Sequence, residues 1–337
     1  MLNFNKEKYL TVTKGAVSLR SQIEGYVDQI FEKGFKNIFL LGSGGSIAIL
    51  QPFEYMLNST STIPTYAEIA SEFIVQNHKQ FDENSLVIVS SLSGSTEETV
   101  AAAEYCKSRG ATTVGLVGEL NTPVANLVDY VLVNYAENDF AADSINLQLY
   151  TLIFRIMYKN KDFPKYEQFI DEMQDAPSML LKVKEKAESK AKTFAEKYKD
   201  ETYHMLVGAG TSWGRTYAYA MCVLEEMQWI HAKSIHAAEF FHGTIEIVEE
   251  DTSIILLKSE DETRPLLDRV ERFAEKYTNK LTVYDTKDYE LDGLSAEFRK
   301  YLAPAVLATA LQRVSVHLED QRGHSLDKRR YYRTVAY

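Results

Sequence analysis

The sequence predicts an α/β protein with two doubly wound, parallel-sheet domains in tandem. Short apolar runs alternate with helix-like segments from about residue 35 onward, which is typical of parallel strands joined by helices. A second alternation begins near residue 203, and 337 residues suit two domains of ordinary size. The expected divisions are an N-terminal helix at 1–34, a first domain at 35–160, a connecting helical segment at 161–198, a second domain at 199–325 and a tail at 326–337.

The first half begins with a predicted amphipathic helix from about residue 6 to 33, because apolar residues recur there at helical spacing. Beyond it, five strand-like runs are separated by segments with helical character. The predicted strands are 37–41, 64–67, 85–89, 112–117 and 130–134. The predicted helices are one starting at 47, then 71–77, 96–109, a short helix near 123, and 144–158.

The second half repeats this plan after a Lys/Glu-rich segment at 181–198, which is typical of a solvated connecting helix. Strands are predicted at 203–207, 252–258 and 280–284, and helices at 265–276 and through 221–228. The repetition predicts that the two halves share one architecture.

Two loops rich in hydroxyl groups follow predicted strands of the first half. Residues 42–46 read Gly-Ser-Gly-Gly-Ser and residues 90–96 read Ser-Ser-Leu-Ser-Gly-Ser-Thr. Either loop taken singly is equally well explained as an ordinary turn. Together they predict a phosphate-binding cradle, because glycine lets an anion approach the backbone and helix N-termini and hydroxyls supply donors. The predicted phosphate ligands are Ser43, Gly44, Ser46, Ser91, Ser93 and Thr96.

The second half has a counterpart of the first loop but not of the second. Residues 208–212 read Gly-Ala-Gly-Thr-Ser, whereas residues 259–263 read Ser-Glu-Asp-Glu-Thr. Three consecutive acids would repel a phosphate. We therefore expect only the first half to hold the anion.

The overall composition is that of a globular protein. The formal net charge of −11 argues against nucleic-acid binding. The two cysteines, Cys106 and Cys222, give neither a metal-binding spacing nor a disulfide framework, so we expect a reducing cytoplasm. No cluster of ligands suggests a metal, and we expect no cofactor. No signal segment or membrane-spanning apolar run is present, and we expect a soluble protein.

A carboxylate and an imidazole are candidates for proton transfer in the stretch from residue 224 to 243. Glu226 and His242 are our choice, since such a pair can divide base and acid roles. Spacing alone does not separate Glu226 from Glu225, either of which suits a solvated helix face. His231 and His236 are interpreted as structural.

A local excess of positive charge lies at residues 327–333, which read Asp-Lys-Arg-Arg-Tyr-Tyr-Arg. This run either closes over an anionic substrate or pairs with a protein that is otherwise acidic. Both interpretations stay open on the sequence.

These motifs resemble the sugar isomerase (SIS) family over nearly the whole chain, specifically its members with two such domains, including the isomerase half of glucosamine-6-phosphate synthase. The resemblance implies two flavodoxin-like domains, phosphate contacts from Ser46, Ser91, Ser93 and Thr96, and roles for Glu226 and His242. Leu92 stands where the synthase has a polar amide, so one phosphate contact is expected to be missing.

A nearer resemblance is to the fructoselysine- and glucoselysine-6-phosphate deglycases. Residues 239–249, Glu-Phe-Phe-His-Gly-Thr-Ile-Glu-Ile-Val-Glu, are similar to a deglycase segment, as are 302–304 and 328–332. Thr244 replaces the proline and Phe241 the basic residue of that segment. Further substrate contacts are implied at Ala142, Glu239 and Arg333. Arg333 aligns with the lysine that forms an imine in the synthase, and a guanidinium cannot form one.

The resemblance implies cleavage of a phosphorylated Amadori compound to a hexose 6-phosphate and a free amine, in a homodimer whose His242 reaches the neighbouring active site. The lack of a preceding glutamine-hydrolysing segment disfavours amino-sugar synthesis. One alternative is an isomerase or deaminase of a hexosamine 6-phosphate. Another is a non-catalytic sugar-phosphate sensor, against which Glu226 and His242 count.

Overall fold

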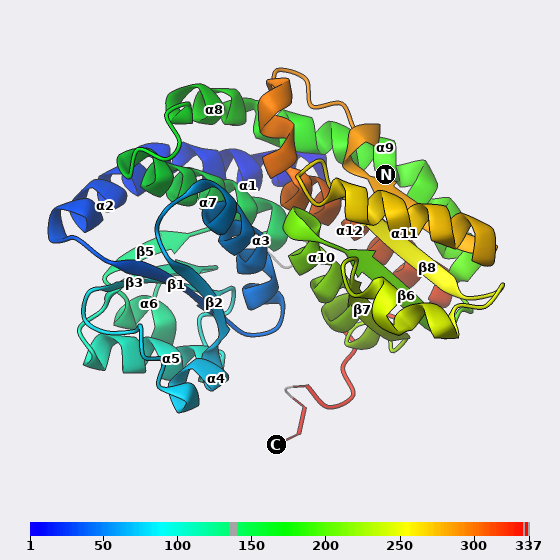
Figure 1. The fold of residues 1–337 in the computed structure, drawn as a ribbon, viewed down its shortest axis with the longest axis horizontal. Helices are drawn as coiled ribbons and strands as arrows, with labels where there is room; N and C mark the ends of the chain where they lie inside the picture. Colours follow the sequence, from blue (N-terminus) through cyan, green and yellow to red (C-terminus); the bar gives the residue numbers. More distant parts are fainter. Residues whose placement is uncertain (135, 137–139, 333, 336–337) are drawn as a thin grey trace. The chain divides into compact units, whose positions relative to one another are not determined.

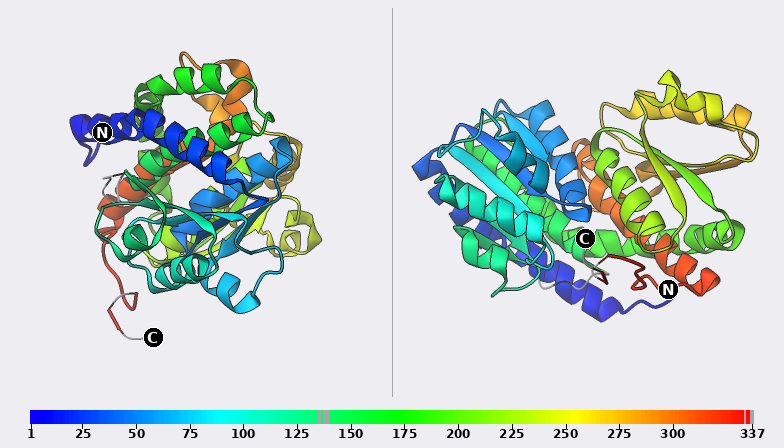
Figure 2. Two further views of the ribbon diagram at one scale, coloured as in Figure 1. Left: turned by 90° about the vertical axis from the view of Figure 1, so that its left-hand side faces the viewer. Right: turned by 90° about the horizontal axis from the view of Figure 1, so that it is seen from below.

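The structure is a computed structural model that describes all residues except 135, 137–139, 333 and 336–337. The chain divides into two compact units. The N-terminal unit comprises Lys6–Ser178 and Gly293–Phe298, and the C-terminal unit comprises Met1–Asn5, Met179–Asp292 and Arg299–Tyr337. Each unit contains one parallel sheet, which Figure 2 shows from two further directions.

The N-terminal unit has a five-stranded parallel sheet in the order β2-β1-β3-β4-β5 (Figure 1). This is the flavodoxin-like order. The chain places β2 on one side of β1 and then places β3, β4 and β5 on the other side, so the strand order reverses between β1 and β3. The central strands are buried throughout, as expected when helices cover both faces. The strands are β1 (Asn37–Gly42), β2 (Thr65–Ile69), β3 (Ser85–Ser91), β4 (Thr112–Val117) and β5 (Tyr130–Val133).

Helices cover both faces of this sheet (Figure 1). One layer contains α1 (Lys6–Ser18), α2 (Arg20–Lys33), α3 (Gly45–Thr60) and α7 (Ala141–Lys159). The other contains α4 (Ala70–Gln76), α5 (Glu97–Ser108) and α6 (Pro123–Leu127). The unit continues through α8 (Tyr166–Glu172) and the 3-10 turn η1 (Met173–Asp175). The predicted N-terminal helix is thus two helices, because the backbone leaves helical geometry at Leu19, with ψ near 1°.

The C-terminal unit has a four-stranded parallel sheet in the order β7-β6-β8-β9. Here β7 lies on one side of β6, and β8 and β9 lie on the other. The strand order therefore reverses between β6 and β8, as it does between β1 and β3 in the first sheet. The strands are β6 (Tyr203–Gly208), β7 (His231–His236), β8 (Ser253–Lys258) and β9 (Lys280–Asp285). The predicted fold class, two doubly wound parallel sheets in tandem, is confirmed.

The second sheet also lies between two layers. One apolar cluster joins α9 (Ala176–Tyr198), the π-helix η3 (Tyr219–Glu225) and α12 (Ala303–Arg322) to the sheet, and another joins α11 (Arg264–Tyr277) to the opposite face. The remaining helical segments are α10 (Trp213–Ala218) and the turns η2 (Gly210–Ser212), η4 (Phe240–His242), η5 (Thr244–Ile247), η6 (Thr286–Asp288) and η7 (Ala296–Tyr301).

Among the strands and α-helices, β7 and α12 were not predicted from the sequence, whereas α8 lies within the helical segment predicted at 161–198. The predicted helix through 221–228 is wrong in detail, because its backbone widens to a π-helix over Tyr219–Glu225. Within the described part of the chain, no helix combines the length and apolarity needed to cross a bilayer.

Candidate functional site

The first predicted phosphate loop joins β1 to α3. Gly44 caps the helix with φ of 55°, a left-handed conformation that glycine adopts without strain. Ser46 lies in the first turn of α3, and its N–H donates to the Ser43 carbonyl over 3.1 Å. The Ser43 hydroxyl is buried and has no hydrogen-bond partner among the described residues. It is therefore free to donate to an anion.

The second predicted phosphate loop joins β3 to α5. Gly94 has φ of +60°, and a Cβ there would lie 2.1 Å from Thr122 Oγ1, so the loop admits only glycine. The hydroxyls of Ser93 and Thr96 lie 3.5 Å apart. Ser91 is 2% exposed, and its hydroxyl has no partner within the described part of the chain.

The N-terminal unit brings both loops to one place. β1 and β3 are neighbouring parallel strands, so their carboxyl ends meet at the same edge of the sheet. That edge is the point where the strand order reverses, and α/β folds bind ligands there. The N-termini of α3 and α5 add partial positive charge. The arrangement suits a phosphate, while Ala142 lies apart from the loops in sequence, half-buried in the first turn of α7.

The equivalent place in the C-terminal unit holds a carboxylate of the chain itself. Asp261 accepts hydrogen bonds from Thr211 N at 2.9 Å, from Thr263 N at 2.8 Å, from Thr263 Oγ1 at 2.5 Å and from Thr211 Oγ1. Gly210 has φ of +54°, and a Cβ there would lie 2.7 Å from Asp261 Oδ1. The donors that would surround a phosphate are therefore already engaged.

The two acids that flank Asp261 are paired with cations. Arg299 donates to both oxygens of Glu260, at 2.8 and 3.0 Å, and Lys300 lies 2.6 Å from Glu262. The predicted reason for excluding phosphate, repulsion by three acids, thus needs correction. Occupation of the donors by Asp261 accounts for the exclusion better than net negative charge does.

Glu226 lies directly after the π-helix, where its N–H donates to the Met221 carbonyl five residues earlier. Single π turns occur often at functional sites. The side chain of Glu226 is 31% exposed, and its Oε1 lies 2.9 Å from Arg329 Nε. Glu225 instead is exposed and accepts from the Ala232 N–H at 3.3 Å. The two adjacent carboxylates therefore have different surroundings.

Trp229 forms a platform beside Glu226 for the tail that follows α12. Its φ of 57° is costly for a bulky residue. The His324 ring packs edge-on at 4.5 Å, and Lys328 and Arg330 lie over the indole at 5.0 and 4.3 Å from its centroid. Sequence reasoning noticed the basic run but singled out neither Arg329 nor Trp229. Arg333, a predicted substrate contact, lies outside the described residues.

His242 and Glu226 come from opposite ends of β7 along the chain. Glu226 precedes the amino end of β7 and His242 follows its carboxyl end, so the strand, roughly 16 Å long, separates their backbone positions. His242 and Glu239 are both exposed. His236, by contrast, accepts from the Ala238 N–H at 3.3 Å, and burial lowers its pKa.

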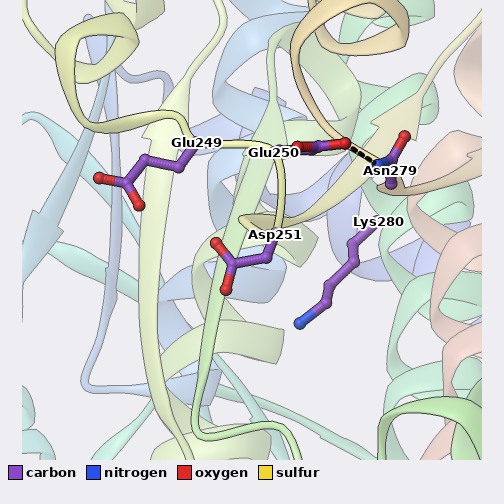
Figure 3. A pocket seen from close by; sticks show the side chains of 5 residues that line it. All are labelled: Glu249, Glu250, Asp251, Asn279 and Lys280. Carbon is purple, nitrogen blue, oxygen red and sulfur yellow. Dashed lines mark hydrogen bonds between the residues drawn. The ribbon is translucent and has the colours of Figure 1, made fainter.

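A hollow of about 580 Å³ lies elsewhere on the C-terminal unit (Figure 3). It is lined by Glu249, Glu250, Asp251, Asn279 and Lys280. Asn279 donates to Glu250 at 2.7 Å, and Lys280 pairs with Glu201 at 2.6 Å. The hollow adjoins the amino ends of β8 and β9, whereas α/β folds bind ligands at the carboxyl ends of their strands. Its lining has three carboxylates and one amine, which disfavours a phosphate.

The described residues include neither a disulfide-bonded cysteine nor a cluster of metal-ligating side chains. Cys106 and Cys222 are free thiols, and burial raises the pKa of each to about 12. Among the described residues, no group of three or more His, Cys, Asp or Glu side chains is arranged to hold a metal ion.

Comparison with known proteins agrees with these features. The SIS domain family matches residues 33–155. The chain is 33% identical to the fructosamine deglycase FrlB of Bacillus subtilis (strain 168) over 332 residues, covering 97% of this chain and 100% of that protein. The chain belongs to the SIS-domain family. The resemblance predicted from the sequence is thereby confirmed, and the protein is an enzyme of this family.

Two further SIS-domain relatives extend the comparison. A fructoselysine 6-phosphate deglycase of Escherichia coli (strain K12) is 23% identical over 92% of this chain and 89% of its own length. A crystal structure of a candidate phosphosugar isomerase from Bacillus subtilis superposes with a TM-score of 0.89 at 33% identity, covering 98% of this chain and 100% of its own.

Proposed function

We propose that this SIS-domain enzyme is a deglycase that cleaves a phosphorylated Amadori-type compound, fructoselysine 6-phosphate or glucoselysine 6-phosphate, into a hexose 6-phosphate and free lysine. The observation that carries the proposal is the full-length similarity to a fructosamine deglycase. The phosphate-type loops of the N-terminal unit and the carboxylate of Glu226 support it.

The proposed reaction consumes one water and needs no change of oxidation state overall. Ser43, Ser46, Ser91, Ser93 and Thr96 hold the phosphate. Glu226 removes a proton from the carbon that bears nitrogen and returns one to the neighbouring carbonyl carbon. The ketosamine thereby becomes an imine, and water adds to it and releases the amine. His242 serves as the general acid for ring opening or at the sugar oxygen, because an imidazole N–H can pass a proton to oxygen.

A homodimer is part of this proposal. Because β7 separates Glu226 from His242 within a chain, the two side chains are better able to cooperate between two copies. The test is complementation. Glu226→Gln and His242→Asn chains, each inactive alone, should regain up to a quarter of wild-type turnover when they are refolded together, the share expected for random pairing with one intact site in each mixed dimer. Failure of the mixture to regain any turnover would count against a shared site.

The principal experiment measures lysine and hexose 6-phosphate release from fructoselysine 6-phosphate, glucoselysine 6-phosphate and, for comparison, glucosamine 6-phosphate. Lysine release should be lost in Glu226→Gln, which should still bind the substrate. Glu225→Gln is the matched control, since Glu225 lies next in sequence but contacts the Ala232 N–H. Turnover of glucosamine 6-phosphate alone would overturn the proposal, and so would full activity in Glu226→Gln.

A further inference from the structure

Three consecutive cations, Lys328, Arg329 and Arg330, lie beside Glu226 in the C-terminal unit. Their concentration is unusual in a chain whose formal net charge is −11. Asp327 precedes them and is exposed. We call residues 328–330 the basic tail segment.

Only one of the three cations is neutralised by a carboxylate. Arg329 pairs with Glu226, whereas Lys328 and Arg330 are exposed and have no carboxylate within ion-pair distance among the described residues. The side chains of both residues lie over the face of Trp229. A cation over an aromatic ring keeps most of its charge available to a ligand.

Hydrogen bonds fix the basic tail segment in place. Gln228 Nε2 donates to the His324 carbonyl at 2.9 Å, and the Leu326 N–H donates to Glu319 at 2.9 Å. Arg329 Nη1 donates to the Leu326 carbonyl at 2.6 Å. The two unneutralised cations are therefore held at a defined place near Glu226 rather than spread over the surface.

The proposed donors to the substrate phosphate belong to the N-terminal unit. Lys328 and Arg330 could therefore bind a second anionic group of the substrate. An adduct at the ε-nitrogen of lysine carries one, the free α-carboxylate, which a chain of four methylenes and the α-carbon joins to the reacting nitrogen. Guanidinium and ammonium groups bind carboxylates well.

We propose that Lys328 and Arg330, which Trp229 holds in place, are specificity-determining residues that select an amine portion with a free carboxylate. This inference rests on the proposed deglycase function. It assigns the recognition of the lysine carboxylate to these two residues.

The test compares fructoselysine 6-phosphate with the adduct of cadaverine, which is lysine without its carboxylate. Wild-type kcat/KM should favour the lysine adduct roughly tenfold, the effect of one charge-assisted hydrogen bond. In the double variant Lys328→Met, Arg330→Met the preference should fall to near one, mainly through KM for the lysine adduct. The control is Lys14→Met, Lys79→Met, which removes two exposed lysines elsewhere and should keep the tenfold preference.

The outcomes are distinguishable. Equal wild-type turnover of both adducts would overturn the inference and leave the deglycase function standing. An equal loss for both adducts in the double variant would also overturn it, because the cations would then act on the shared phosphate or on folding. If neither adduct releases amine, the proposed function itself fails.

Discussion

The carboxylate of Asp261 accepts hydrogen bonds from both the backbone N–H and the hydroxyl of Thr211, the former at 2.9 Å. The two residues come from the loops after β8 and β6, which correspond to the two phosphate-type loops after β3 and β1. The hydroxyls of Ser43 and Ser91 in the first repeat have no partner among the described residues, while the second repeat binds its own carboxylate. We therefore expect an anion to bind only in the first repeat.

Replacing Asp261 should destabilise the loop that it shares with Thr211. Asp261→Ala leaves the buried donors of Thr211 unsatisfied and should lower the free energy of unfolding by about 3 kcal/mol. Inorganic phosphate should restore part of the loss, since it can occupy the vacated donors. Urea denaturation with and without phosphate measures both effects. Asp251→Ala, at an exposed acid, is the control, and equal stability of the two variants would contradict the assignment.

Ser91 should contribute to phosphate binding in the N-terminal unit. Its hydroxyl is buried and has no partner among the described residues, so Ser91→Ala costs the folded protein little but removes a donor to a dianion. A hydrogen bond to a charged group is worth about 2 kcal/mol, and KM should rise by roughly thirtyfold with kcat less affected. Ser95→Ala, at an exposed position of the same loop, should leave KM unchanged. An unchanged KM in Ser91→Ala would show that Ser91 does not bind the phosphate.

Arg329 should orient Glu226. Its Nε lies 2.9 Å from the carboxylate while its Nη1 is held by the Leu326 carbonyl, so the planar guanidinium fixes one oxygen of Glu226 in place. Arg329→Gln should lower kcat about tenfold with a smaller change in KM, and Arg329→Lys should recover part of kcat. Steady-state kinetics at fixed pH separates the two parameters. A variant that raises KM alone would indicate substrate binding instead of orientation.

The fold class could be predicted from the sequence because a chain in which apolar strands alternate with helices can form only a few architectures. β7 was missed because all its residues except Ile235 are exposed or half-buried, so that the strand gives no apolar run. The two phosphate-type loops were predicted because each is contiguous in sequence. The pairing of Glu226 with Arg329, and of Thr211 with Asp261, depends on tertiary contacts between distant segments, which no local pattern records.

Glu188 and Arg313 should anchor the chain start to α12. Burial opposes ionisation of Glu188, but hydrogen bonds from Arg313 and from the Leu2 N–H outweigh it and lower its pKa to about 2. Glu188→Gln would leave the fully buried Arg313 guanidinium without its counter-charge, and should cost about 3 kcal/mol of unfolding free energy. Denaturant melts at pH 7 measure the loss. Glu185→Gln, three residues earlier on α9, is the comparison and should cost much less.

His204 should make stability depend on pH in the weakly acidic range. Burial lowers its pKa to about 4, and Nδ1 lies 2.7 Å from the Ser253 hydroxyl. The folded protein therefore keeps His204 neutral while the unfolded chain takes up a proton below its ordinary pKa of about 6.5. Because the unfolded state binds more protons in this window, stability falls as pH drops from about 6.5 to 4, by about 3 kcal/mol for this residue. His204→Phe retains an aromatic ring beside Phe194 and Tyr198 but cannot titrate. The difference in unfolding free energy between wild type and His204→Phe, measured at intervals from pH 7 to 4, should therefore shift steadily in favour of the variant. A difference that is constant with pH would contradict this prediction, because it would mean that His204 has the same pKa in the folded and unfolded states.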